Sequence, residues 1–278
     1  MLRMTGKGPL KYLKALSLEP FDFLIHAFCT RQGGVSKGSF SSLNVSDREG
    51  DDADCVRRNF ERIASAFGFS PGNFLPIRQV HGDGIRVLDR EPAIFEDNPP
   101  PQIDAVVTDR PAIALCIKTA DCVPILLADP IRQVIGAVHA GWKGTALGIA
   151  EKTVDTFVRR FASKPQDILA LIGPAIGPCC YEVDSPVFEA MAGHPQRAAF
   201  FSRIPDRQRW MLDLPLANKI QLLDRCLRPE NILSSGLCTS CRQDLFFSHR
   251  RDRCQTGRHL NFIMLRGDLP AGCSGKSA

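Results

Sequence analysis

Two histidines and a cysteine lie at the ends of strand-like apolar runs, where a side chain can face a cleft. His81 falls in RQVHGDG, Cys122 in KTADCVPILL, and His139 in GAVHAGWKG, seventeen positions beyond Cys122. Small or turn-forming residues flank each of them, and such residues mark the ends of elements. Because the chain has only six histidines, two of them in this setting indicate a candidate reactive site.

A thiolate with two imidazoles is a typical zinc ligand set. Three protein ligands leave one tetrahedral position for water or substrate, which marks a catalytic rather than a structural zinc site. Zinc also lowers the pKa of water to about 7 and supplies hydroxide at neutral pH. The residues alone leave two alternatives to a metal site open. In the first, Cys122 is a nucleophile and His139 is its base. In the second, Cys122 is a small buried side chain and both histidines bond the backbone.

The apolar pattern predicts the elements that must position these residues. Four strand-like runs lie between 104 and 140, and their short connections exclude parallel crossovers, so they should pair antiparallel or belong to different sheets. Helical periodicity predicts helices over 52–69, 145–161 and 214–227. Further strands are expected at 25–30, 77–89 (two short ones), 168–174, 232–237 and 259–265. This order predicts an α+β fold in one domain over 21–268, with a loose N-terminal arm (1–20) and a disordered tail (269–278).

Composition narrows the class of protein. The 278 residues are 44% hydrophobic and 23% charged, which is ordinary for a globular chain. The net charge of +5 suits an anionic small molecule, and pronounced basic clusters occur only near 250–258, so we expect no nucleic-acid partner. Eleven irregularly spaced cysteines do not indicate a secreted disulfide framework. With no signal peptide and no membrane-length apolar run, we expect a cytoplasmic protein without a membrane or protein partner.

Seven motifs, in order over about residues 25–265, resemble those of the bacterial laccase-domain family. They are TRQGGVS, SLN, RQVHG, IDAVVTDRPAIALCIKTADCVPILLADP, IGAVHAGWKGTALGI, IGPAIGPCCYEV and DLFFSHRRD…TGR. The family was first described as multicopper polyphenol oxidases and later as zinc-dependent purine nucleoside phosphorylases. The resemblance implies that His81, Cys122 and His139 hold the metal. It also implies a layered β-sandwich of mixed, largely antiparallel sheets flanked by helices, similar to toxin-type cysteine hydrolases.

The resemblance further implies an activity and its cofactor. Family members cleave adenosine, inosine and methylthioadenosine with phosphate and deaminate adenosine, so purine nucleosides and phosphate are the expected partners. Six histidines without a His-x-His pair cannot supply the imidazoles of a multicopper oxidase. Copper can still replace zinc at one His/Cys/His site, and we treat polyphenol oxidation as a side reaction. Editing of peptidoglycan precursors is a further alternative, although no motif predicts a peptide groove.

Several basic residues in these motif segments are candidates for binding phosphate, because guanidinium groups bind phosphate through two hydrogen bonds. They are Arg31, Lys143, Arg250, Arg251 and Arg258. We favour Arg31 and Arg250, with a solvated surface charge as the alternative for each.

Three other residues have two interpretations each. Asn44 can bond a ribose or a base, or cap its own loop. Asp121 can orient an imidazole or move a proton, or it is a turn residue. Trp142 can stack on a purine, or it belongs to the core.

Two cysteine-containing segments do not fit the main site. GPAIGPCC (173–180) is interpreted as a rigid turn, because its prolines remove backbone donors. Cys238 and Cys241 form a C-x-x-C pair that needs two more ligands for a structural zinc site. Cys254 and His249 follow at loose spacing, so a packed loop is the favoured interpretation.

Overall fold

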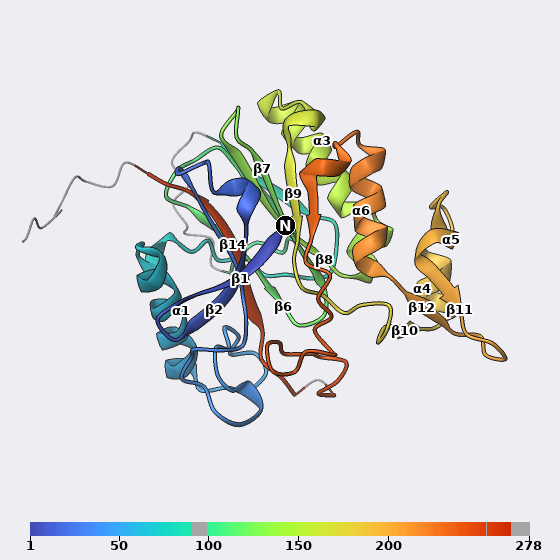
Figure 1. The fold of residues 1–278 in the computed structure, drawn as a ribbon, viewed down its shortest axis with the longest axis horizontal. Coiled ribbons are helices and arrows are strands. Elements are labelled where there is room, and N and C mark those ends of the chain that lie inside the picture. Colours follow the sequence, from blue (N-terminus) through green and yellow to red (C-terminus); the bar gives the residue numbers. More distant parts are fainter. Residues whose placement is uncertain (90–98, 254, 268–278) are drawn as a thin grey trace, which may run out of the picture.

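Two β-sheets stack face to face, with helices on both outer faces (Figure 1). The computed structural model describes residues 1–89, 99–253 and 255–267. The first sheet is antiparallel, in the order β1 (Leu2–Lys7), β2 (Leu10–Ala15), β3 (Leu24–Cys29), β14 (His259–Leu265) and β6 (Ala114–Thr119). The second sheet has the order β13 (Ile232–Ser234), β9 (Leu169–Ile172), β7 (Val123–Asp129), β8 (Val134–Ala140), β5 (Ala105–Thr108) and β4 (Ile85–Leu88). Its two edge strands are parallel to their neighbours and the inner pairs are antiparallel.

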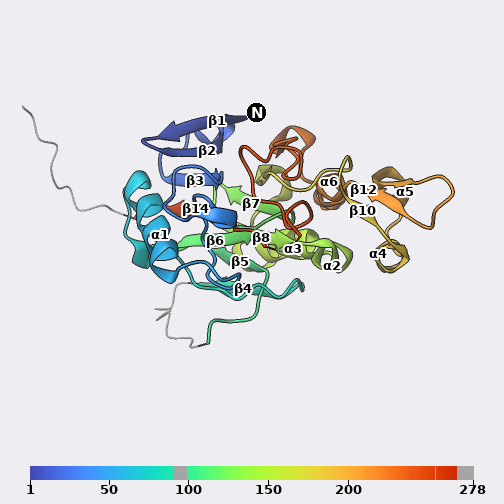
Figure 2. The same cartoon turned by 90° about the horizontal axis from the view of Figure 1, so that it is seen from below.

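Helices cover the outer faces of both sheets. Helix α1 (Ala53–Phe67) packs on the first sheet, whereas α3 (Ile149–Phe161) and α6 (Leu214–Asp224) pack on the second. A small sheet of β10 (Glu182–Val183), β12 (Trp210–Leu212) and β11 (Phe201–Arg203) projects at one end with α4 (Ser185–Ala190) and α5 (Arg197–Phe200), as Figure 2 shows. Helix α2 (Trp142–Ala146) follows β8. Short 3-10 turns cover Leu16–Leu18, Gly38–Phe40, Pro71–Asn73, Pro165–Asp167 and Pro229–Asn231.

Strand side chains alternate between the central core and an outer core, as a period of two requires. In β7, Ile125 packs under the helices of the second sheet, while Leu126 faces the first sheet. In β14, Ile263 faces the space between the sheets and Phe262 packs against α1. The central strands of both sheets are therefore buried on two faces, which explains why their sequences are nearly continuously apolar. The layered α+β fold expected from the sequence is confirmed.

Most expected elements are present, with boundaries set by local chemistry. The helix expected at 52–69 is α1, because the Asp52 side chain accepts the backbone N–H groups of Asp54 and Cys55. It ends at Gly68, whose φ of 78° is the left-handed conformation that favours glycine. The helix expected over 145–161 is wrong at its start. A left-handed Gly148 separates α3 from the short α2.

Two other expectations need correction. Residues 1–20 are not a loose arm, because β1 and β2 form a hairpin that pairs with β3 and extends the first sheet. Of the two strands expected within 77–89, only β4 forms; Arg78 makes an isolated bridge to Gln102. The expected disordered tail (269–278) and Cys254 lie outside the described residues.

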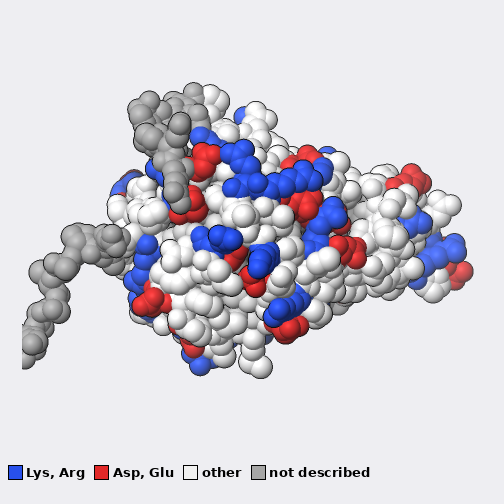
Figure 3. All heavy atoms as spheres, turned by 90° about the horizontal axis from the view of Figure 1, so that it is seen from above, with Lys and Arg blue, Asp and Glu red and all other residues white. Residues whose placement is uncertain are grey.

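Among the described residues, no helix is both long and apolar enough to cross a membrane. On the face shown in Figure 3, Lys and Arg side chains lie among Asp and Glu side chains. That face therefore does not concentrate charge of one sign.

Candidate functional site

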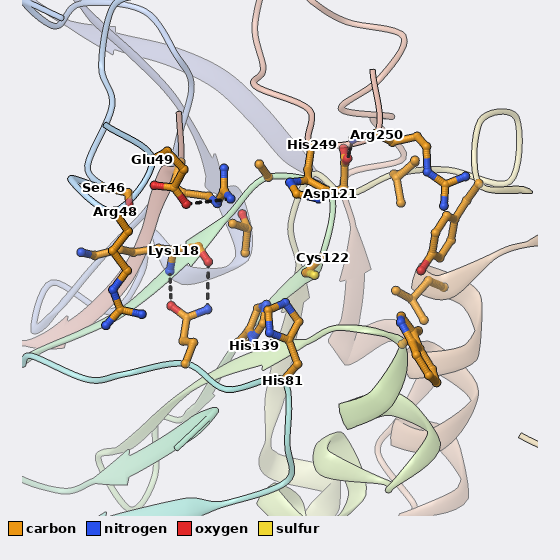
Figure 4. Close-up of a pocket in the computed structure, with 18 of the residues that line it drawn as sticks. Ser46, Arg48, Glu49, His81, Lys118, Asp121, Cys122, His139, His249 and Arg250 are labelled. Carbon is orange, nitrogen blue, oxygen red and sulfur yellow. Dashed lines mark hydrogen bonds and ion pairs between the residues drawn. The ribbon is translucent and has the colours of Figure 1, made fainter. Parts of the chain in front are cut away.

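His81, Cys122 and His139 come together at one end of the sheets. Cys122 lies in the connection that crosses from β6 in the first sheet to β7 in the second. The β7–β8 pairing then sets Pro124 opposite His139, which brings the two ends side by side. Figure 4 shows both imidazoles and the thiol directed toward one another. Their ligand atoms lie within 4.8 Å of one another, and the two imidazole rings meet edge to face with centroids 4.8 Å apart.

The donor set fits a metal ion. Bonds of about 2.0–2.3 Å to one zinc ion require ligand atoms roughly 3.3–3.8 Å apart. The ligand atoms of His81, Cys122 and His139 lie within 4.8 Å of one another, which is close to this requirement. The set is therefore geometrically able to hold one ion, and nitrogen and sulfur donors are those that zinc prefers.

A buried carboxylate that the sequence motifs do not indicate bonds the His139 ring and the backbone at His81. Asp104 is fully buried, and its Oδ1 lies 2.7 Å from Nδ1 of His139. The same carboxylate accepts the backbone N–H groups of Val80, His81 and Gly82 at 3.2, 3.0 and 2.7 Å. Asp104 thus fixes the His139 ring with its other nitrogen toward the site, as carboxylates behind zinc-binding histidines do.

Two residues at the site have a backbone conformation that side chains rarely adopt. His81 has φ 61° and Asp121 has φ 90°. Such conformations cost about 1–3 kcal/mol and persist where the surroundings impose them. At His81 the imposing group is Asp104, which binds the backbone of three consecutive residues. The hydrogen bonds therefore maintain a strained turn that directs His81 into the site.

Cys122 and His139 also control each other's protonation. Burial raises the pKa of Cys122, but the charge of His139 and hydrogen bonds from both imidazoles outweigh it and bring the pKa to about 6. Burial lowers the pKa of His139, but the Cys122 thiolate and the Asp104 carboxylate raise it to about 9. The pair thus favours a thiolate at neutral pH, and the thiolate is the form that binds metals or attacks as a nucleophile.

A pocket of about 470 Å³ opens over these residues. Ligand pockets typically measure about 300–1,000 Å³, so a nucleoside fits this volume. Trp142 and Tyr181 provide aromatic surface at one side. Four cationic residues also line the pocket, namely Arg48, Lys118, Arg250 and Arg258. Glu49 neutralises Arg258 in an ion pair of 2.8 Å.

The structure places three of the expected substrate residues outside this pocket. Arg31 donates to the backbone oxygens of Ser41 and Gln243 and lies over the Phe247 ring. Asn44 is buried, and its amide bonds its own loop at Ser46. Lys143 is exposed on α2. The side chains of Arg31 and Asn44 therefore each bond the backbone of loops.

Arg250 and Asp121 lie at the pocket and are linked. The Asp121 carboxylate accepts hydrogen bonds from Thr239 Oγ1 at 2.6 Å, Ser248 Oγ at 3.1 Å and the Arg250 backbone N–H at 2.7 Å. Asp121 therefore anchors the loop that carries Arg250. The Arg250 guanidinium donates to the Glu182 carbonyl at 2.7 Å and lies 5.0 Å from the Tyr181 ring centroid. The carboxylate that bonds the His139 imidazole is Asp104.

A second group of side chains that could bind a metal lies apart from the first. Cys238 and Cys241 meet Cys179 and Cys180, with the four sulfur atoms within 4.8 Å of one another. His249, considered above as a further ligand of this pair, lines the pocket instead. Sequence spacing could not identify this group, because about 60 residues separate its two halves.

Known proteins resemble the chain over nearly its full length. Residues 25–266 match the family described as multi-copper polyphenol oxidoreductase laccase. The chain is 39% identical over 249 residues to purine nucleoside phosphorylase YlmD of Geobacillus stearothermophilus, covering 88% of this chain and 91% of that protein. It is 41% identical over 256 residues to a purine nucleoside phosphorylase of Deinococcus radiodurans, covering 92% of each. The crystal structure of Bacillus licheniformis hypothetical protein YfiH aligns with a TM-score of 0.87 at 36% identity, covering 95% of this chain and 99% of that one.

Proposed function

The chain belongs to the laccase-domain family, and from that premise we propose that it is a zinc-dependent purine nucleoside phosphorylase. We further propose adenosine, inosine and methylthioadenosine as its substrates. The observation that carries the proposal is the convergence of His81, Cys122 and His139 on one point of a pocket that also contains cationic and aromatic side chains. Relatives named purine nucleoside phosphorylase support the same reaction class.

Phosphorolysis makes defined demands on this pocket. An oxygen of phosphate forms a bond to C1′ of the ribose, the bond from C1′ to the purine nitrogen breaks, and the proton that the phosphate loses passes to the leaving purine. Arg250 is proposed to bind phosphate together with Lys118 and Arg48, which line the same pocket. Their charges favour the anion and orient it for in-line attack. The faces of Trp142 and Tyr181 are proposed to stack on the purine.

The proposed metal ligands are His81 Nε2 or Nδ1, Cys122 Sγ and His139 Nε2. A zinc ion there would supply a Lewis acid that polarises a bound polar group of the substrate. Asp104 keeps the proton on Nδ1 of His139, so that Nε2 remains a donor to the ion. Asp121 is proposed as a positioning residue that acts through the Arg250 loop.

The test is a Cys122→Ser variant assayed for bound zinc and for adenine released from adenosine. We expect adenine release to require phosphate and to fall by at least about a thousandfold in the variant, because a thiolate ligand is lost. Cys226→Ser, which changes an exposed free cysteine, is the matched control and should retain both properties. Full phosphate-dependent activity in Cys122→Ser protein would contradict the proposal.

Adenosine deamination is a second proposed activity of the same site. A three-ligand set leaves a coordination position at which water can be activated, as zinc deaminases do with histidine and cysteine ligands. We expect inosine and ammonia from adenosine in the absence of phosphate. Loss of phosphorolysis but not of deamination on removal of the metal would show that one centre does not serve both reactions.

The thiolate state of Cys122 also supports a rival, a metal-independent cysteine hydrolase. In that case, stoichiometric alkylation of Cys122 would abolish activity in metal-free protein that was active beforehand. Polyphenol oxidation is proposed only as a side reaction of copper in the same site. Exchange of zinc for copper should then raise oxidation and lower phosphorolysis in the same preparation. Activity on peptidoglycan precursors would favour an editing role.

A further inference from the structure

Four cysteines from two distant segments meet beside the candidate active site. Cys179 and Cys180 follow β9, whereas Cys238 and Cys241 follow β13. The Cys241 sulfur lies 3.5 Å from that of Cys179 and 3.4 Å from that of Cys180. All four sulfur atoms lie within 4.8 Å of one another.

These separations match a metal site better than a disulfide. A disulfide brings two sulfur atoms to about 2.05 Å, and all four of these cysteines are free thiols. Four thiolates at about 2.3 Å from a tetrahedral zinc ion lie about 3.8 Å from one another. The observed sulfur–sulfur distances of 3.4 and 3.5 Å are close to that value.

One backbone N–H group at the cluster is directed at a cysteine sulfur. The Gly177 N–H donates to the Cys238 sulfur at 3.3 Å, and N–H groups directed at sulfur are typical of metal-bound cysteines. Gly177 also lacks a side chain where space is limited, because a Cβ there would lie 3.3 Å from Cys238 Cβ and 3.4 Å from Cys179 Sγ. The segment can therefore approach the C-x-x-C turn closely.

The fold brings the two segments together independently of any ion. Strands β9 and β13 pair in parallel, and beyond them Ala175 and Cys238 form an isolated parallel bridge. The Ala175 N–H donates to Leu237 O at 3.3 Å, and the Thr239 N–H donates to Ala175 O at 3.0 Å. The ligand set is thus preorganised by main-chain hydrogen bonds.

We propose that Cys179, Cys180, Cys238 and Cys241 bind one zinc ion in a closed, four-thiolate structural site. Four protein ligands leave no position for substrate, which distinguishes this site from the three-ligand site at Cys122. Binding displaces the thiol protons into solvent, so the affinity for zinc rises with pH until the thiols are ionised.

The position of the cluster gives the ion a specific task. The segment that begins at Gly177 leads to Tyr181, which lines the pocket. Ile176, just before Gly177, also lines the pocket, and its N–H donates to the Asp121 carbonyl. On the other segment, Thr239 between the two cysteines donates to the Asp121 carboxylate at 2.6 Å. The ion would therefore fasten the loop that supplies Ile176 and Tyr181 to a second loop that bonds Asp121, another residue of the pocket.

The test is the zinc content of the full chain, purified under reducing conditions without chelator. We expect two zinc ions per chain in the wild-type protein and one each in Cys238→Ser, Cys241→Ser and Cys122→Ser. The Cys226→Ser control should retain two. After cobalt replacement, Cys122→Ser should keep an intense thiolate-to-cobalt charge-transfer band, whereas Cys238→Ser should keep only the weaker absorption of a one-thiolate site.

A measurement on unmodified protein guards against misfolded variants. Cys179 and Cys241 are exposed, so a thiol reagent should modify them readily if no metal is bound. We expect slow modification, with zinc release in step with it and faster reaction after chelation.

Three results would overturn the proposal. These are immediate reaction of all four thiols without zinc release, a disulfide among them in freshly reduced protein, and unchanged zinc content in both Cys238→Ser and Cys241→Ser. None of these results depends on catalysis, so the proposed phosphorylase activity can stand or fail separately.

Discussion

Asp104 is a single buried residue that bonds two of the three candidate metal ligands. It binds the ring of one candidate ligand and the backbone of the other. Burial raises the pKa of Asp104, but hydrogen bonds from His139 and from the backbone N–H groups of Gly82 and Val80 outweigh it and hold the pKa below its usual range. The carboxylate is therefore charged and a strong acceptor at neutral pH.

We predict that Asp104→Asn lowers zinc affinity at the His81–Cys122–His139 site by about 10–100-fold, the usual effect of removing such a carboxylate. The neutral amide holds the His139 ring less firmly and raises its basicity less. Competition with a chelator of known affinity measures the change. Asp129→Asn is the control, because Asp129 is also buried and accepts backbone N–H bonds from Ile131 and Arg132. Equal affinity in wild-type and Asp104→Asn protein would contradict the assigned role.

Sequence spacing identified residue types but not their partners. His81, Cys122 and His139 are recognisable because each stands beside turn-forming residues at the end of an apolar run. Asp104 gives no such signal, because one Asp before a strand is common, and its contact with His139 depends on the β5–β8 pairing. The motifs indicate Arg31 and Asn44 as substrate residues, yet in the structure their side chains bond the backbone of loops.

Among the elements, the turn after β8 packs closely against the candidate ligands. Gly141 is the N-cap of α2 there, and a Cβ at this position would lie 3.1 Å from His81 Cδ2 and 3.2 Å from Cys122 Sγ. The φ of Gly141 is −73°, so its backbone tolerates any residue. The restriction is thus one of space around the candidate ligands.

We predict that Gly141→Ala lowers phosphorolysis by at least about tenfold, because displacing a catalytic group by a fraction of an ångström impairs the reaction strongly. Unfolding free energy should change by less than about 1 kcal/mol, since only flexible side chains must move. Gly193→Ala is the control, because a Cβ there meets nothing within 4 Å. Equal kcat/KM values for the two variants would argue against close packing around the ligands.

The sequence predicts the boundaries of an element where local caps set them, and it fails where contacts with distant residues form the element. Asp52 and Gly68 delimit α1 by their own side chain and backbone, so periodicity alone located it. The hairpin of β1 and β2 was not foreseen, because β1 is largely exposed and carries no apolar alternation. Its pairing depends on β3, which the local pattern of residues 1–20 cannot reveal.

For the molecule as a whole, two buried histidines make the stability of the fold depend on pH in the acid range. His26 Nε2 accepts the Ala15 N–H at 2.8 Å, and His259 Nε2 accepts the Phe247 N–H at 2.8 Å. Burial lowers the pKa of His26 to about 4 and that of His259 to about 3. Both rings must therefore stay neutral in the folded state.

We predict that the free energy of unfolding decreases as the pH falls from 6.5 toward 4. The unfolded chain takes up protons at its histidines near pH 6.5, whereas the folded chain resists until about pH 4 or 3. Each histidine adds a slope of about 1.4 kcal/mol per pH unit within its window. Urea titrations of wild-type and His26→Gln protein measure the slopes. The slope of unfolding free energy against pH should be smaller in the variant by about 1.4 kcal/mol per pH unit, the contribution of one proton. Identical slopes would refute the assignment.

The stacking of two sheets was foreseen only through the resemblance to the laccase-domain family. Short connections between 104 and 140 correctly indicated antiparallel or inter-sheet pairing, and β6 indeed lies in a different sheet from β5, β7 and β8. The partner of β6 is β14, about 140 residues further along the chain. Periodicity cannot specify such pairings, because it reports which face of a strand is apolar and not which strand lies beside it.

The central claim is that the His81–Cys122–His139 site, once loaded with zinc, cleaves purine nucleosides with phosphate. The most direct measurement is adenine release from adenosine and phosphate by metal-depleted protein as zinc is added back. We expect negligible release before addition, recovery that saturates once the sites are filled, and no recovery in Cys122→Ser protein. Full adenine release by the depleted wild-type protein, or none after zinc is restored, would contradict the account.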